Sequence, residues 1–480
     1  MSDLSIKYLR TSFQFIPDEY KISNINERRD TQNIWPKQSF SGTSPLNGRV
    51  KQNHNAQEVI KDLCDFIEKS PTALQAVQES VFRLEQAGYK RLLPGMTVEA
   101  DKKYYQTIGN TSLLAFKTPK VLVKGVVLGA HCDSPGLKLK PDPISVRNGQ
   151  VLLRSEVYGG PILSSYFNRE FGLAGQVAYI STDGSVKMCS VNAKEAIATV
   201  PHLAVHLNRE QKTKIDIKTQ THLDALCGPI QEGEEVPTLA DILASHLPND
   251  LERILNHELF LVPIEKPALI GLKKDMLASP RLDNLLGLHA SLAALLNSED
   301  SDHVLQMMIS WDHEEVGSES YKGAASPWLE RVLHHIHRDL ESTHKDPQGF
   351  FEHVLLVSND VAHAVHPSHS ERHDPKHGPK LDAGPVIKYN ANQRYATDCQ
   401  TAAFVHSAAI RAGIGVQEFV SNNEISCGST IGPISASKAG LATVDIGTPV
   451  LSMHSLRELT HVKSHLEMCQ LLKSLLEQYS

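Results

Sequence analysis

The chain has 480 residues, of which 41% are hydrophobic and 21% charged, a composition typical of a globular protein with substantial cores. Its 48 basic and 55 acidic residues leave a formal net charge of −7. The chain therefore lacks the overall positive charge that is typical of nucleic-acid-binding proteins. No apolar run approaches the roughly 20 residues that span a bilayer, and the N-terminus lacks the pattern of a signal peptide. The seven cysteines form no Cys-x-x-Cys pair. We therefore expect a cytoplasmic protein with no nucleic-acid or membrane partner.

Residues 1–55 differ from the rest of the chain. They are polar and show no sustained hydrophobic period, which is typical of an extension without a packed core. A propeptide or an assembly arm is the alternative interpretation.

Residues 56–141 are predicted to form two helices and a buried strand. "AQEVIKDLCDFIEKS" and "TALQAVQESVFRLEQAG" space apolar residues on one helical face, and Gly88 fits a helix C-terminus. "VLVKGVVLGA" is a continuous β-branched run, as expected for a strand covered on both faces.

Residues 142–272 are predicted to form a β-rich inserted domain. Asn148-Gly149 and Asp183-Gly184 each separate two strand-like segments, which is the signature of a hairpin. The segment "PTLADILASHL" adds some helix.

Residues 273–480 return to alternating helices and buried strands. The strands are "HVLQMMISW", "HVLLVS" and "LATVDIG", and helical segments lie between and after them. This alternation predicts an α/β fold, with a mainly parallel sheet flanked by helices. The sheet is expected to form from 56–141 and 273–480 together.

Acidic and imidazole side chains follow several of the predicted strands. Parallel sheets bind ligands beyond the carboxyl ends of their strands, so these side chains are expected at one edge. Any one of them alone also fits a loop residue or a helix cap, so the argument rests on their coincidence. The residues are His131, Asp133, Glu314, Glu315, Asp360, His454, and Asp283 at the start of a predicted helix.

This set of side chains suits metal chemistry. Two imidazoles and several carboxylates match zinc, cobalt or manganese. Five ligands exceed what one catalytic zinc normally takes from protein, whereas two ions that share a carboxylate would use them all. Asp133 lies two residues after His131 on an extended segment, so it can support that imidazole.

Other catalytic motifs are incomplete. "HEEVG" begins like the zinc helix His-Glu-x-x-His, but position 317 is glycine. No G-x-S-x-G elbow surrounds Ser429, and the glycine-rich stretches match neither a P-loop nor G-x-G-x-x-G.

Ordered motifs from about residue 56 to the C-terminus resemble those of the aspartyl aminopeptidase family, which includes the vacuolar aminopeptidase I type. They are "GAHCDSPGLKLKP", "VYGG", "VPHLAVHLNR", "PRLDN", "DHEEVGSES", "NDVAHAVHP", "GPVIKYNANQRYATD", "CGSTIGPI" and "IGTPVLSMHSLRE". The resemblance implies a zinc-exopeptidase-like catalytic domain interrupted by a β-rich domain used in dimer formation.

The resemblance also implies roles for the residues at the strand ends. One metal would take His131 and Asp360, and the other Glu315 and His454. Asp283 would bridge both, with a cis peptide bond to Asn284. Glu314 would be the general base that accepts a proton from the metal-activated water.

Substrate residues follow from the resemblance as well. Lys388 matches the position that faces an acidic P1 side chain, although the residue alone also fits a surface strand lysine. His363 and Tyr395 match further substrate contacts. His206 matches a histidine that reaches a neighbouring subunit's active site, and a metal-ligand role stays open for it.

These observations favour a metal-dependent aminopeptidase that hydrolyses the N-terminal bond of peptides with free N-termini, preferring Asp or Glu. The resemblance implies two divalent ions per subunit, Zn²⁺ first with Co²⁺ or Mn²⁺ as alternatives, and a homododecamer built from dimers. One alternative is a broad or Leu-preferring aminopeptidase on the same scaffold. Another is a catalytically silent assembly or cargo protein that keeps the fold.

Overall fold

The computed structural model describes residues 47–212 and 215–477. The chain divides into two units, Met1–Asn55 and Ala56–Ser480, and everything below concerns the second. The predicted extension over 1–55 lies outside the described residues as far as residue 46, and helix α1 (Asn47–Lys69) begins within its last part.

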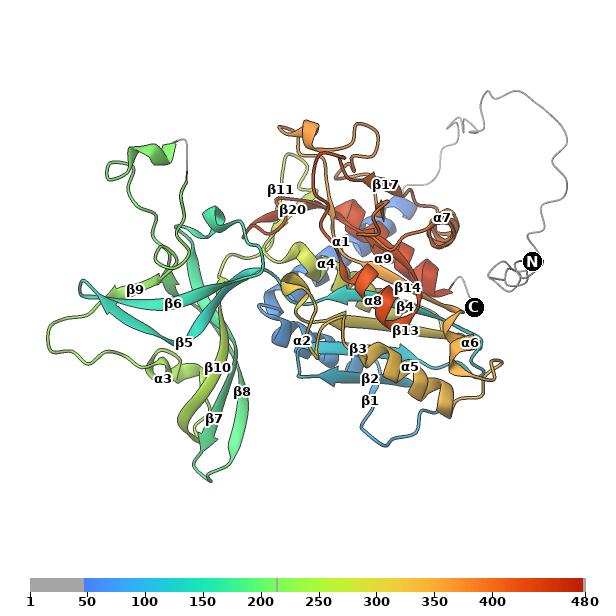
Figure 1. Ribbon diagram of the computed structural model, residues 1–480, viewed down its shortest axis with the longest axis horizontal. Coiled ribbons are helices and arrows are strands. Elements are labelled where there is room, and N and C mark those ends of the chain that lie inside the picture. The colour runs from blue at the N-terminus through green and yellow to red at the C-terminus, as the bar shows by residue number, and fades with distance from the viewer. Residues whose placement is uncertain (1–46, 213–214, 478–480) are drawn as a thin grey trace, which may run out of the picture. The chain divides into compact units, whose positions relative to one another are not determined.

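A nine-stranded mixed sheet forms the centre of the second unit (Figure 1). In spatial order its strands are β1 (Lys90–Arg91), β2 (Lys103–Ile108), β3 (Ser112–Lys117), β13 (Val304–Trp311), β4 (Lys124–His131), β14 (Val354–Asn359), β18 (Ala442–Gly447), β16 (Val386–Tyr389) and β17 (Gln417–Val420). The four central strands β13, β4, β14 and β18 run parallel, whereas β3 and β16 pair antiparallel with their outer members. The carboxyl ends of the four central strands therefore meet at one edge, as predicted.

Helices cover both faces of this sheet, which explains why its strands read as continuous apolar runs. Val126 and Leu128 of β4 pack on one face and Val127 on the other. The first face carries α1, α2 (Ala73–Gln86), α4 (Leu282–Asn297), α7 (Cys399–Ala412) and α9 (Val462–Glu477); the second carries α5 (Trp328–Asp339), α6 (Pro347–Phe351) and α8 (Ile431–Ala439). Among the described residues, no helix has the length and apolarity needed to cross a lipid bilayer.

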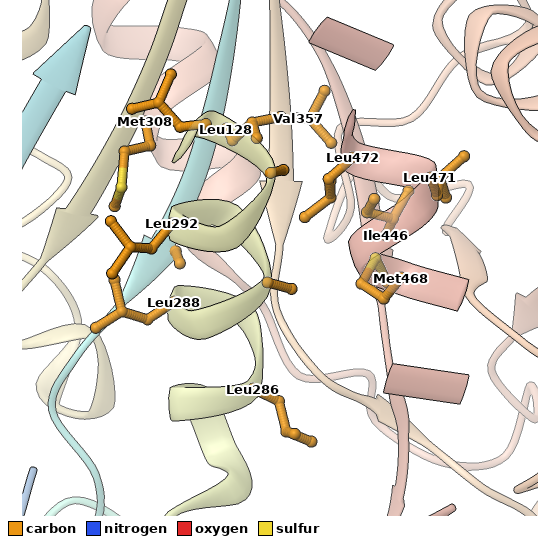
Figure 2. Packing of buried hydrophobic residues seen from close by; sticks show 14 of the residues in the cluster. Leu128, Leu286, Leu288, Leu292, Met308, Val357, Ile446, Met468, Leu471 and Leu472 are labelled. Carbon is orange, nitrogen blue, oxygen red and sulfur yellow. The ribbon is translucent and has the colours of Figure 1, made fainter. Parts of the chain in front are cut away.

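Helix α4 lies at the centre of the larger core (Figure 2). Its residues are buried on nearly every side, as expected for a helix that is apolar all round. Leu288 and Leu292, four residues apart, project from the same side of the helix, near Met308 of β13. Leu471 and Leu472 of α9 complete the packing. The start of α4 is thus held by a large buried surface.

The inserted β-rich domain is a closed six-stranded barrel (Figure 1). Its strands are β5 (Gly136–Arg147), β6 (Gln150–Tyr158), β9 (Ala225–Pro229), β8 (Val186–Thr199), β7 (Glu170–Ser181) and β10 (Leu251–Pro263). The predicted Asn148-Gly149 turn joins β5 to β6, and both residues have positive φ angles of 52° and 69°, as a type I′ turn requires. The predicted helical segment contains the short α3 (Leu239–Ile242) and a 3₁₀ turn, η4 (Ala244–His246).

A small five-stranded sheet was not predicted from the sequence. It contains β11 (Ala268–Ile270), β12 (Met276–Ser279), β20 (Glu458–His461), β19 (Pro449–Leu451) and β15 (Ala362–His363). These strands contain two to four residues each, which is too short for the hydrophobic pattern to show a clear period of two. The sheet matters because two of its loops lead into the candidate site.

Replacing Leu292 by alanine tests the importance of the α4 core. The side chain is 1% exposed, so we expect the free energy of unfolding to fall by about 2–5 kcal/mol. Denaturant titration of the full chain measures this loss. Leu272→Ala is the matched control, because Leu272 is fully exposed and should change stability by less than about 0.5 kcal/mol. Equal effects of the two changes would contradict the role assigned to this core.

Candidate metal centre

Side chains from five segments converge beyond the carboxyl ends of the central strands. His131 is the last residue of β4, and Asp360 directly follows β14. Glu315 lies in a 3₁₀ turn, η5 (Glu314–Val316), shortly after β13. Asp283 stands in the first turn of α4, and His454 follows β19. Segments far apart in the sequence thus place three carboxylates and two imidazoles together.

The two oxygens of Asp283 face two different imidazoles. Oδ1 of Asp283 lies 3.3 Å from Nε2 of His131, and Oδ2 lies 3.3 Å from Nε2 of His454. His131 Nε2 is also 3.4 Å from Oδ1 of Asp360, and His454 Nε2 is 3.4 Å from Oε2 of Glu315. The site therefore consists of two imidazole–carboxylate pairs that share one aspartate.

These spacings fit divalent zinc. Two ligand atoms bound to one tetrahedral zinc at 2.0–2.1 Å lie about 3.3–3.4 Å from each other, which matches the four separations. Buried oxygens of Asp283 (Oδ1) and Glu315 (Oε1) accept no hydrogen bond from the described residues. Unsatisfied buried carboxylate oxygens are costly unless a cation lies beside them. The donor set of nitrogen and oxygen atoms also suits this ion.

His454 reaches the site by a different path from the one predicted. The strand "LATVDIG" is β18 of the central sheet, but the chain then enters β19 of the small sheet. His454 lies in the turn between β19 and β20, with a positive φ of 69°. The cis peptide bond expected between Asp283 and Asn284 is confirmed.

Asp133 holds the turn that carries the paired glutamates. Its Oδ1 accepts a hydrogen bond from the backbone N–H of Glu314 and its Oδ2 from that of Glu315, both at 3.1 Å. The hydroxyl of Tyr158 donates a third hydrogen bond to Oδ2 at 2.7 Å. His131 Nδ1 lies 3.1 Å from the backbone oxygen of Asp133 and 3.4 Å from its carboxylate, so the peptide carbonyl is the nearer acceptor. The predicted support of His131 thus comes mainly from the backbone of Asp133.

Glu458 is a supporting residue that the sequence analysis missed. One oxygen accepts a hydrogen bond from the backbone N–H of Asp283 at 3.0 Å, and the other from that of His454 at 2.8 Å. The side chain is 1% exposed, and burial together with the charge of Asp283 raises its pKa to about 8. The quoted motif "IGTPVLSMHSLRE" contains this glutamate, but no pattern distinguishes it from a surface acid.

A second missed feature joins the start of α4 to the end of β14. Asn284 Nδ2 donates to the carbonyl of Asn359, Asn359 Nδ2 donates to the carbonyl of Gly287, and the Gly287 N–H donates to Asn284 Oδ1. A Cβ atom at Gly287 would lie 2.4 Å from both Asn284 Oδ1 and the Asn359 oxygen. Only glycine fits there. This closed triangle fixes Asp283 relative to Asp360.

The adjacent glutamates are electrostatically costly without cations. Burial raises the pKa of Glu314 to about 8; His131 opposes this shift, and the charges of Asp360 and Asp283 add to it. Burial and then the charge of Asp283 raise the pKa of Glu315 well above its usual range. Cations next to the carboxylates would reverse both shifts.

The predicted substrate residues lie beside the site. Lys388 on β16 is 1% exposed, and its Nζ donates to the backbone oxygens of Asp360 at 2.9 Å and Val361 at 3.2 Å. The same Nζ lies 5.1 Å from the ring centre of Tyr395. His363 in β15 is exposed. A buried lysine is therefore in direct contact with the backbone of one predicted metal ligand.

His206 does not join the site within this chain. It is exposed in the loop after β8 and belongs to none of the potential metal-binding groups found among the described residues.

Comparison with known proteins agrees with this chemistry. A family model described as aminopeptidase I zinc metalloprotease (M18) matches residues 66–476. The probable M18 family aminopeptidase 2 of Ectopseudomonas mendocina (strain ymp) is 42% identical over 421 residues, covering 85% of this chain and 96% of that protein. Its counterpart in Pseudomonas fluorescens (strain Pf0-1) is 42% identical over 420 residues, with the same shares covered.

Solved structures share the fold. A chain in the cryo-EM structure of the Ape4 and Nbr1 complex is 31% identical, with a TM-score of 0.83, and the match covers 88% of this chain and 86% of that one. The S. cerevisiae mApe1 dodecamer is 24% identical, with a TM-score of 0.77, over 89% of this chain and 100% of that one. These likenesses confirm the predicted α/β fold with its β-rich insertion. The chain belongs to the M18 family of zinc aminopeptidases.

Proposed function

We propose that this chain is a dinuclear aminopeptidase that removes N-terminal residues from peptides and prefers Asp or Glu. The single observation that carries the dinuclear proposal is the position of Asp283. Each of its two oxygens faces a separate imidazole–carboxylate pair at 3.3 Å from the imidazole nitrogen. A site for one ion would need only one of these pairs and would leave the other buried carboxylate without a partner.

The residues present would hold two divalent ions. His131 and Asp360 would bind one, Glu315 and His454 the other, and Asp283 both. When bound, such ions polarise the scissile carbonyl and make water a stronger acid. Zinc follows from the family, and Co²⁺ or Mn²⁺ would fit the same donors.

Glu314 is the proposed general base. Its backbone is fixed by Asp133. An oxygen of its half-buried carboxylate lies within 4.8 Å of donor atoms of His131 and Glu315, but it makes none of the four contacts of 3.3–3.4 Å that define the two pairs. It lies near both, since the charges of Asp283 and Asp360 act on it. Once cations lower its pKa, the carboxylate accepts a proton from the attacking water and later passes it to the leaving amine.

Lys388 and Tyr395 support the preference for acidic substrates. A buried ammonium group beside an aromatic ring favours a carboxylate over an apolar side chain, because an unpaired buried charge is costly. The two carbonyl oxygens occupy two of its three donor positions, which leaves one hydrogen free for a substrate carboxylate. His363 is exposed next to Ala362 and is proposed as a further substrate contact.

Self-association through the barrel is part of the proposal. Val186, Met188, Leu203, Val205 and Leu207, on β8 and the following loop, are exposed although they are large and apolar. Exposed apolar groups of this kind are typical of protein interfaces. The related S. cerevisiae mApe1 forms a dodecamer, and we propose a dodecamer built from dimers for this chain. His206 in the same loop would then act at a neighbouring subunit's site, where it would contact the substrate or a metal ion.

Two other functions remain as alternatives on this scaffold. A broad or Leu-preferring aminopeptidase would use the same centre with another specificity pocket. A silent assembly or cargo protein would keep the fold without turnover, as the complex of Ape4 with Nbr1 makes worth testing. Rates of metal-loaded, assembled protein on peptides with N-terminal Asp, Glu and Leu separate all three cases.

Glu314→Gln and Glu315→Gln test the division of roles between the adjacent glutamates. We expect Glu314→Gln to keep the full metal content and to lower kcat by about 10²–10⁴-fold, because only the base is removed. Glu315→Gln should lose metal from one of the two positions. Metal content by mass spectrometry and steady-state kinetics measure both effects. Equal metal loss in the two variants would refute the division.

Lys388→Met tests the acidic preference. A substrate-facing ammonium predicts that kcat/KM for Asp and Glu peptides falls at least about 30-fold, the equivalent of ~2 kcal/mol, while the value for Leu peptides is kept. If Lys388 only positions Asp360, all three substrates lose activity together and metal content falls. A strong Leu preference of the unmodified protein would refute the acidic proposal directly.

Glu458→Gln tests the support of the centre. An amide offers one acceptor oxygen in place of two, so one of the N–H groups of Asp283 and His454 loses its partner. We expect metal affinity or activity to fall by about 10–100-fold, as for other supporting residues of metal sites. Glu299→Gln, at an exposed position, is the matched control and should have no effect. Unchanged metal affinity in Glu458→Gln would contradict the proposed support.

A further inference from the structure

A second group of metal-binding side chains lies between helices, apart from the candidate metal centre. Nδ1 of His289 on α4 is 3.0 Å from Nε2 of His465 on α9. The sulfur of Cys469, one turn further along α9, is 3.6 Å from the same His465 nitrogen. These three ligand atoms all lie within 4.8 Å of one another.

Two of the three separations are close to those of an ion bound to two nitrogens and a sulfur, and the third, between Nδ1 of His289 and the sulfur of Cys469, is within 4.8 Å. For Zn–N of 2.0–2.1 Å and Zn–S of 2.3 Å, tetrahedral geometry places nitrogen and sulfur about 3.6 Å apart, as His465 and Cys469 are. The two imidazole nitrogens would have to separate by only about 0.3 Å to reach the zinc spacing. Rotations of buried rings by small angles are enough for that.

Asp62 on α1 supports His289 as ligating histidines are usually supported. Its Oδ2 lies 3.0 Å from Nε2 of His289, which assigns the ring proton to Nε2 and leaves Nδ1 free to bind. Arg83 Nη1 lies 2.8 Å from the same oxygen.

Both imidazoles are buried, with 1% of His289 and 0% of His465 exposed. Because the His289 proton lies on Nε2, Nε2 of His465 donates the hydrogen bond to Nδ1 of His289. Binding of an ion would move this proton of His465 from Nε2 to Nδ1. Nδ1 of His465 has no hydrogen-bond partner among the described residues. Its polar contacts are thus confined to the other two members of the group.

We propose that His289, His465 and Cys469 form a third metal site, which binds zinc or another thiophilic divalent ion. The thiol gives up its proton to solvent when the ion binds, since the thiolate is the ligand. Burial raises the pKa of the Cys469 thiol to about 12, so the ion itself must displace the thiol proton. The residue is partly exposed, and the fourth tetrahedral position would be left to water. None of these three residues belongs to the centre described above.

An ion at this site would act on structure rather than on the reaction. It would join α4 to α9, and Asp62 would extend the connection to α1. Asp283 stands at the start of the same helix α4. The ion would therefore fix the helix that carries the shared aspartate.

Cobalt spectroscopy of the full-length protein tests the proposal. A thiolate bound to Co²⁺ gives a charge-transfer band in the near ultraviolet, which carboxylate and imidazole ligands do not give. Cys132, next to His131 in the sequence, donates to the backbone oxygens of Thr111 and Trp311 instead. The Cys469→Ala variant assigns the band to Cys469 among the seven free cysteines. We expect the band in the metal-free protein titrated with Co²⁺.

Cys469→Ala should abolish the band and remove one equivalent of bound metal, while Cys189→Ala, on the barrel, should change neither. In the unmodified protein, zinc should also slow alkylation of Cys469, located by peptide mass spectrometry. This second measurement does not depend on the folding of a variant. Absence of the band at saturating Co²⁺, or a band that persists in Cys469→Ala, would overturn the proposal, and so would alkylation of Cys469 at the same rate with and without zinc.

Discussion

The crowding of negative charge around Asp283 is the constraint on which the rest of the site depends. Asp283, Glu315 and Asp360 meet with Glu314 beside them, and burial penalises the charged forms of Asp283, Glu314 and Glu315. Although burial opposes it, the neighbouring carboxylates raise the pKa of His131 well above its usual range and that of His454 to about 9, so the imidazoles offset part of this charge. Divalent cations would offset the rest, which couples this edge of the sheet to metal binding.

Hydrogen bonds to the backbone, in addition to contacts between side chains, hold the crowded carboxylates in place. Asp133 accepts the N–H groups of both adjacent glutamates, and Tyr158 supports Asp133 from the barrel side. The barrel strand β6 thus contacts the candidate metal centre through one hydroxyl. The insertion therefore helps to support the candidate metal centre.

The sequence was sufficient for some features and not for others, for physical reasons. Continuous apolar strands such as β13 predicted the buried sheet, and the acids after each strand predicted where His131 and Asp360 would lie. The substrate roles and the bridging role of Asp283 came from the family resemblance. Glu458 and the triangle around Gly287 could not be predicted, because each depends on contacts between segments remote in the sequence. The short strands of the small sheet left no periodic signal, so the path to His454 was also missed.

The position of Glu458 affects how precisely Asp283 and His454 are held relative to each other. Because one carboxylate holds the backbones of both Asp283 and His454, any displacement of that carboxylate moves the two ligands in the same direction. A movement of strand β20 that displaces the Glu458 carboxylate would therefore shift both backbones together. Asp283 and His454 can then move together as one body. Such a movement leaves the 3.3 Å separation between Oδ2 of Asp283 and Nε2 of His454 nearly unchanged.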